Sequence, residues 1–189
     1  ARRVIRARVL LAAAAPRGAA AFLYLQKRIA LPYIDIRDNG IMNPSDILQF
    51  FDGAWSGEED VAATPWMPAG RSRATIKNAL AFGGSVLLHD YRTERDGKIW
   101  FSAHAVITAG AEPDTLELFW FDSFGYRAHA GARGSWDGEQ LVFTRTSERG
   151  TTRHVYRPAG QRAFRLLLET SVGADALRTI LTGTYRRAG

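Results

Sequence analysis

The sequence predicts an all-β protein: an antiparallel up-and-down barrel of about ten strands, with a short helix before the first strand and a partly helical extension before that helix. Three observations support this fold class. About ten short apolar segments, mostly alternating, follow one another over roughly 145 residues. Tight-turn dipeptides such as Asp96-Gly97 and Asp137-Gly138 separate neighbouring segments. No connection has the length of the helical crossover, about twelve residues, that a parallel sheet requires.

The first predicted element of the barrel domain is a helix over residues 45–51. Ser45 is a favourable cap for it, Asp46 stabilises its positive end, and Gly53 follows its last turn. The first strand then opens with Gly53-Ala54-Trp55. Further strands are expected over residues 75–80, 86–93, 99–108, 115–123, 127–136, 140–146, 152–157, 164–170 and 179–186. The pair Gly83-Gly84 leads into one of these strands, which predicts a bend or a bulge there.

The two ends of the predicted barrel carry a complementary pair of residue types. Trp55 stands at the start of the first strand, and the last strand ends in Arg186 and Arg187. Closure brings the first and last strands side by side, so one of these arginines is expected to lie flat on the Trp55 indole. Such stacking contributes about 0.5–2 kcal/mol. The role expected for Trp55, Arg186 and Arg187 is therefore structural closure of the barrel.

Five segments carry a resemblance to known proteins: GAWSGEE (53–59), HDYRTERDG (89–97), FWFDSFG (119–125), GSWDG (134–138) and GTYRR (183–187). They resemble the calycins, which include lipocalins, fatty-acid-binding proteins and haem-binding nitrobindins and which pack a terminal arginine on a Gly-x-Trp motif. The chain is more similar to a bacterial family of uncharacterised lipocalin-like domains, over about residues 45–187. The resemblance implies the barrel and leaves the function open. The nitrobindin Gly-rich segment followed by Tyr-Pro is absent.

The charge and composition limit the partners and the compartment. The formal net charge is +6, and residues 1–41 carry all of it, with eight Lys or Arg against two Asp. The remaining domain, residues 42–189, is neutral, so no nucleic-acid partner is expected. The absence of cysteine excludes disulfides and thiolate chemistry and fits the cytoplasm.

The extension over residues 1–41 leaves two interpretations open. Its apolar run over residues 9–15 is short for an export signal, although arginines precede it. The other interpretation is that the natural protein starts at Met42 and that the extension lies upstream of it. Charged residues interrupt the second apolar stretch, so no membrane span is expected.

Alternation along the predicted strands selects candidate residues for the barrel interior. His89 and Tyr91 share one face of their strand, and Trp100 and His104 share one face of the next. A hairpin about the intervening Asp-Gly turn would place both faces on the same side. The lumen is therefore expected to contain His89, Tyr91, Trp100, His104 and Trp120. The alternative is that these faces point outward, or that the histidines are hydrogen-bonded core residues.

Three functions remain open from the sequence. The first is binding of a small apolar or aromatic ligand inside the barrel, with no cofactor and with a homodimer as an open alternative. The second is a hydrolase or isomerase that uses His89 or His104 as base with Asp90 or Asp122. The third, implied only by the nitrobindin likeness, is haem binding through His104 or His154. No metal site is expected, because His89, His104, His129 and His154 lack the short spacing of zinc ligands.

Overall fold

The computed structural model describes residues 44–65, 67–112, 114–125, 130–148, 150–173 and 175–189. Helix α1 (Pro44–Phe51) is followed by ten strands: β1 (Gly53–Val61), β2 (Gly70–Ala81), β3 (Val86–Arg95), β4 (Lys98–Ala109), β5 (Thr115–Asp122), β6 (Ala132–Trp136), β7 (Leu141–Ser147), β8 (Gly150–Pro158), β9 (Ala163–Thr170) and β10 (Arg178–Arg187). The extension and the boundary predicted at Met42 lie outside the described residues. No helix within the described ranges is long and apolar enough to cross a membrane.

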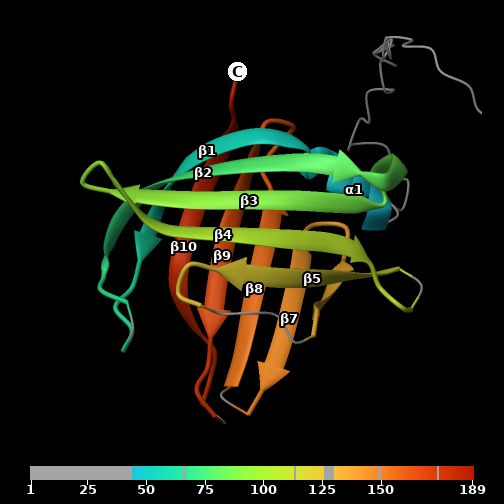
Figure 1. The fold of residues 1–189 in the computed structure, drawn as a ribbon. Helices are drawn as coiled ribbons and strands as arrows, with labels where there is room; N and C mark the ends of the chain where they lie inside the picture. The colour runs from blue at the N-terminus through green and yellow to red at the C-terminus, as the bar shows by residue number, and fades with distance from the viewer. Residues whose placement is uncertain (1–43, 66, 113, 126–129, 149, 174) are drawn as a thin grey trace, which may run out of the picture. The chain divides into compact units, whose positions relative to one another are not determined.

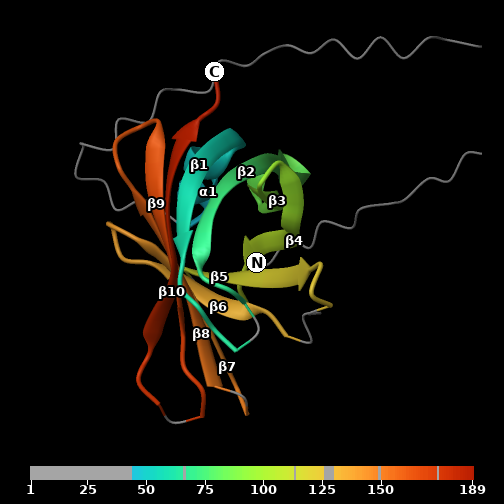
Figure 2. The same cartoon turned by 90° about the vertical axis from the view of Figure 1, so that its left-hand side faces the viewer.

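The strands form one closed barrel in which each strand pairs antiparallel with its neighbours in the sequence, and β10 pairs with β1 (Figures 1 and 2). The predicted fold class, including the helix before the first strand, is confirmed. Closure depends on a close backbone approach at Gly57, where a Cβ atom would lie 2.3 Å from the carbonyl oxygen of Thr184. A side chain at this position would therefore separate β1 from β10.

Local turn chemistry sets most of the strand order. Asp96 and Gly97 both adopt positive φ, 49° and 71°, which is the geometry that joins β3 and β4 by a two-residue turn. Asp137 instead accepts hydrogen bonds from the backbone N–H groups of Glu139 and Gln140, at 2.9 and 2.8 Å. The bend expected at Gly83-Gly84 is a single turn of 3₁₀-helix between β2 and β3.

Helix α1 lies against β2, the 3₁₀ turn that follows β2, and β6, and it closes one end of the barrel with an aromatic cluster (Figure 1). Phe51 meets the rings of Tyr156 and Phe164 at centroid distances of 5.7 and 5.3 Å, and Trp55 meets Phe164 at 5.0 Å. Tyr185 stacks on Phe164 at 4.7 Å. All of these side chains are buried, so this end of the barrel is filled.

Barrel side chains also satisfy the last carbonyl groups of α1, which have no partner within the helix. The Arg187 guanidinium lies 4.3 Å from the centroid of the Trp55 ring and donates to the carbonyl oxygens of Phe50, at 2.7 Å, and Asp52. The Trp55 indole donates to the carbonyl oxygen of Phe51 at 2.9 Å. Of the two arginines considered from the sequence, Arg187 makes the contact, whereas Arg186 is exposed.

Candidate functional site

A cavity of about 600 Å³ occupies the part of the barrel away from the filled end. No residue of α1 lines it. Two of the residues that line it, Phe124 and Val172, are exposed to solvent. The barrel is therefore packed solid at the helix end and hollow at the other.

Four of the five residues expected in the lumen line this cavity: His89, Tyr91, Trp100 and Trp120. On β3 the alternation holds along the strand, so His89, Tyr91 and Thr93 are buried while Asp90 and Arg92 are exposed. Whether any of these residues contacts a ligand remains a prediction.

The prediction that His104 faces the lumen is wrong. Its side chain is 49% exposed, and its Nδ1 lies 2.9 Å from Oδ1 of the exposed Asp90. The reason is a β-bulge: Glu94 pairs with Ile99, but Thr93 pairs with Phe101, so Trp100 is an extra residue in β4. This one-residue shift turns Phe101 and the alternate residues after it inward and turns His104 outward.

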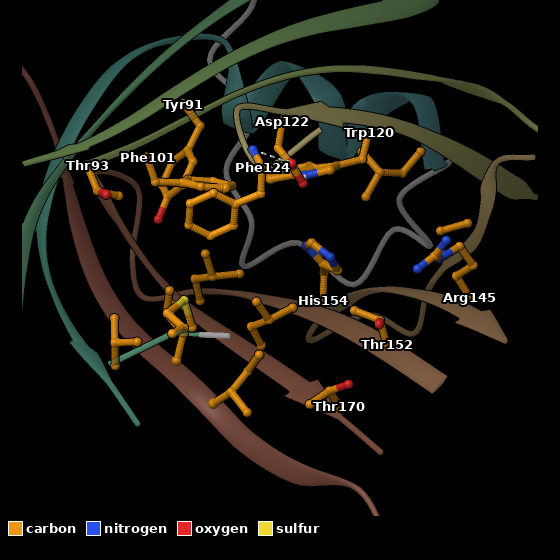
Figure 3. A pocket seen from close by; sticks show the side chains of 18 of the residues that line it. Tyr91, Thr93, Phe101, Trp120, Asp122, Phe124, Arg145, Thr152, His154 and Thr170 are labelled. Atoms are coloured by element: carbon orange, nitrogen blue, oxygen red, sulfur yellow. Dashed lines mark hydrogen bonds between the residues drawn. The ribbon is translucent and has the colours of Figure 1, made fainter. Parts of the chain in front are cut away.

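One wall of the cavity is aromatic. Tyr91 meets Phe101 and Trp120 at ring-centroid distances of 5.8 and 6.1 Å, and Phe101 meets Phe124 at 5.0 Å (Figure 3). Asp122 fixes this wall, because it accepts hydrogen bonds from the Trp120 indole at 3.1 Å and from the backbone N–H of Phe124 at 3.0 Å (Figure 3). The wall therefore offers a cluster of aromatic rings to a molecule that enters the cavity.

Glu59 lines the cavity although only 1% of the residue is exposed. Its carboxyl group accepts hydrogen bonds from the hydroxyls of Tyr91, at 2.6 Å, Tyr185, and Ser72, at 3.2 Å. Burial raises the pKa of Glu59, and the hydrogen bonds from Tyr185, Tyr91 and Ser72 oppose that rise. Three donors therefore satisfy this acid inside the barrel.

His89 and His154 both reach the cavity as neutral rings at pH 7. The pKa of each is lowered to about 4, mainly by burial, and for His154 the positive charge of Arg145 contributes to this decrease. Nδ1 of His89 lies 2.8 Å from Oδ1 of Asn78, whose amide nitrogen donates to the carbonyl oxygen of Phe51. This network assigns the ring proton to Nδ1 of His89 and leaves Nε2 as an acceptor.

Among the described residues, no buried His–Asp pair of the kind that the hydrolase hypothesis needs is found. The partner of His89 is an amide, and Asp122 is engaged by Trp120 and Phe124. His104 and Asp90 do form a pair, but both are exposed on the outer surface of the barrel. Among the described residues, no group of three or more His, Asp or Glu side chains is placed to hold a metal ion, and His129 lies outside them.

Several residues that line the cavity were not predicted as lumen residues, among them Glu59, Phe101 and Arg145. Glu59 lies an even number of residues after Trp55 on β1, so both side chains are on the same face of the strand. The burial of Glu59 could have been predicted from this position. Arg145 lies on β7, where polar residues occur on both faces and the alternation gives no assignment. His154 was considered only as a haem ligand.

No known family model and no curated protein matches the chain. Among solved structures, the chain is similar to Rv2717c from M. tuberculosis, with a TM-score of 0.61 and 17% identity over 79% of this chain and 100% of that one. It is also similar to the S-type phycobiliprotein lyase CPES from Guillardia theta, with a TM-score of 0.59 and 9% identity over 79% of this chain and 94% of the lyase. At these identities the likeness establishes the barrel fold and no activity. Membership of the bacterial lipocalin-like family stays a prediction.

Proposed function

We propose that this protein binds a small apolar or aromatic molecule inside the barrel. The observation that carries the proposal is the cavity of about 600 Å³, a size typical of small-molecule sites, beside an aromatic wall. Aromatic rings such as Tyr91, Phe101 and Trp120 bind flat apolar groups by contact area and ring stacking. The lumen residues proposed to contact the ligand are His89, Tyr91, Trp100 and Trp120.

Binding of N-phenyl-1-naphthylamine, a neutral aromatic dye, tests the proposal. Saturable binding with quenching of tryptophan fluorescence is expected, because Trp100 and Trp120 line the cavity. Leu168→Trp fills part of the cavity and should weaken dye binding about tenfold, which corresponds to about 1.4 kcal/mol.

Leu167→Trp is the matched control, because Leu167 is the preceding residue of β9 and does not line the cavity. It should leave the dye affinity unchanged. Equal effects of the two substitutions, or no saturable binding to the unaltered chain, would contradict the proposal. Native mass spectrometry of gently purified protein provides a second measurement, since a retained molecule adds its mass.

A second candidate is haem, and one observation favours it. His154 faces the cavity with ring nitrogens that hydrogen-bond to no described residue, and a neutral imidazole is the form that binds haem iron. The residues present therefore fit an axial ligand, with His154 as the residue that would hold the iron. Hemin titration should give a Soret band that His154→Ala removes. A flat spectrum would exclude this candidate and leave the apolar-ligand proposal intact.

A further inference from the structure

A strip of polar side chains crosses the cavity wall formed by β7, β8 and β9. This polar strip consists of Arg145, Thr152, His154 and Thr170, all of which line the cavity. Arg145 pairs with Thr152 across β7 and β8, and Thr152 pairs with Thr170 across β8 and β9. His154 is two residues along β8 from Thr152, on the same face. Figure 3 shows the four side chains together, and His154 meets Trp120 of the aromatic wall at a ring-centroid distance of 5.2 Å.

The polar strip is rich in hydrogen-bond donors. The Arg145 guanidinium carries a positive charge and several N–H groups. Neither the ring nitrogens of His154 nor the Thr152 hydroxyl hydrogen-bond to any described residue. The positive charge of Arg145 also acts on His154, which places the two groups within one electrostatic environment.

The acids Glu59 and Asp122, which line the cavity, accept hydrogen bonds from its own wall. Glu59 accepts hydrogen bonds from the hydroxyls of Tyr91, Tyr185 and Ser72, and Asp122 accepts from the Trp120 indole and the Phe124 amide. Thr152 and His154 therefore present hydrogen-bond donors toward the cavity, beside the positive charge of Arg145. An acceptor with negative charge is the chemical group that complements this wall.

We propose that the ligand is an organic acid: an apolar or aromatic body that lies against the aromatic wall and an anionic group, such as a carboxylate or sulfonate, that the polar strip binds. Arg145 supplies the charge, and Thr152 and His154 donate the hydrogen bonds that fix the orientation. This inference rests on the proposed function, because it assigns a chemical class to the molecule in the same cavity.

Two dyes that differ by one sulfonate separate the inference from the function on which it rests. N-Phenyl-1-naphthylamine is neutral, and 8-anilinonaphthalene-1-sulfonate has the same ring system with an anionic group. The full chain should bind the sulfonate more tightly than the neutral dye. Arg145→Gln should weaken sulfonate binding by about tenfold or more and change neutral-dye binding by less than about twofold, since a charge-assisted hydrogen bond is lost only for the anion.

Arg165→Gln is the matched control, because Arg165 is exposed on β9 and does not line the cavity, while the change in net charge is the same. Thr152→Val is a second variant that keeps the charge and should also weaken sulfonate binding selectively. Thermal melts confirm that each variant folds. If the neutral dye binds but Arg145→Gln and Arg165→Gln affect the sulfonate equally, the inference is wrong and the proposed function stands. If neither dye binds the unaltered chain, the proposed function itself fails.

Discussion

Replacement of Arg187 by methionine tests how the helix end of the barrel is closed. Methionine keeps the apolar stem of the side chain but removes the guanidinium that covers Trp55 and donates to two carbonyl groups at the end of α1. Arg186→Met is the matched control, because Arg186 is the adjacent residue of the same strand and is exposed.

The expected loss follows from the contacts that Arg187 makes. Stacking on Trp55 contributes about 0.5–2 kcal/mol. Each hydrogen bond, to the carbonyl of Phe50 in α1 and to that of Asp52 just after it, adds about 1 kcal/mol, which is below the range of about 1.5–3 kcal/mol for charged groups because the guanidinium is only half-buried. The sum is about 3 kcal/mol. For a chain of this size, such a loss lowers Tm by roughly 6–12 °C.

Differential scanning calorimetry of the two variants measures this difference directly. Arg187→Met should show the predicted drop, whereas Arg186→Met should melt within about 2 °C of the unaltered chain, as expected of an exposed surface substitution. A drop of similar size in both variants would mean that general charge loss, and not the contact with Trp55 and α1, stabilises the barrel. A drop in neither would refute the closure role of Arg187.

Three other predictions concern stability. Gly134→Ala places a Cβ atom 2.3 Å from the buried Phe143 ring, and urea unfolding should show a loss of about 1–3 kcal/mol. The pKa of His89 is about 4 in the folded chain and 6.5 in the unfolded chain. This difference contributes about 3 kcal/mol to the free energy of unfolding above pH 6.5, and that contribution is lost as the pH falls to 4. His89→Gln should remove this part of the pH dependence of stability. A chain that starts at Met42 should melt cooperatively within a few degrees of the full chain; aggregation would make residues 1–41 part of the domain.

Most of the fold could be predicted because its determinants are local. Asp96-Gly97 specifies a tight turn through the backbone angles that Asp and Gly tolerate, and the turn alone makes β3 and β4 neighbours. The alternation on β2 and β3 is strict, since every second residue is buried there. The contact between Trp55 and Arg187 could be expected because closure of the barrel brings the first and last strands together. Closure itself depends on the number of strands and not on any single pair of residues.

The error at His104 shows what local patterns omit. A β-bulge adds one residue to one strand, and nothing in the residues around Trp100 marks it. The turn at Asp96-Gly97 predicted the register correctly up to Glu94 and Ile99, but the register changed at the next pair. Because side chains alternate with a period of two, one extra residue exchanged the inner and outer faces of β4. His104 therefore moved from the predicted lumen to the outer surface.

The polar strip could not be predicted for a different reason. Polar residues occupy both faces of β7 and β8, so Arg145 and Arg153 are equivalent in the sequence pattern. Only the closed barrel distinguishes them: Arg145 lines the cavity, while Arg153 lies 3.3 Å from Glu169 in an ion pair. Glu59 was accessible to prediction, because it lies an even number of residues after Trp55, which must face inward to close the barrel. A charged residue in the inward phase of a barrel strand costs free energy unless it is paired, so such positions are where sequence reasoning should look for a binding site.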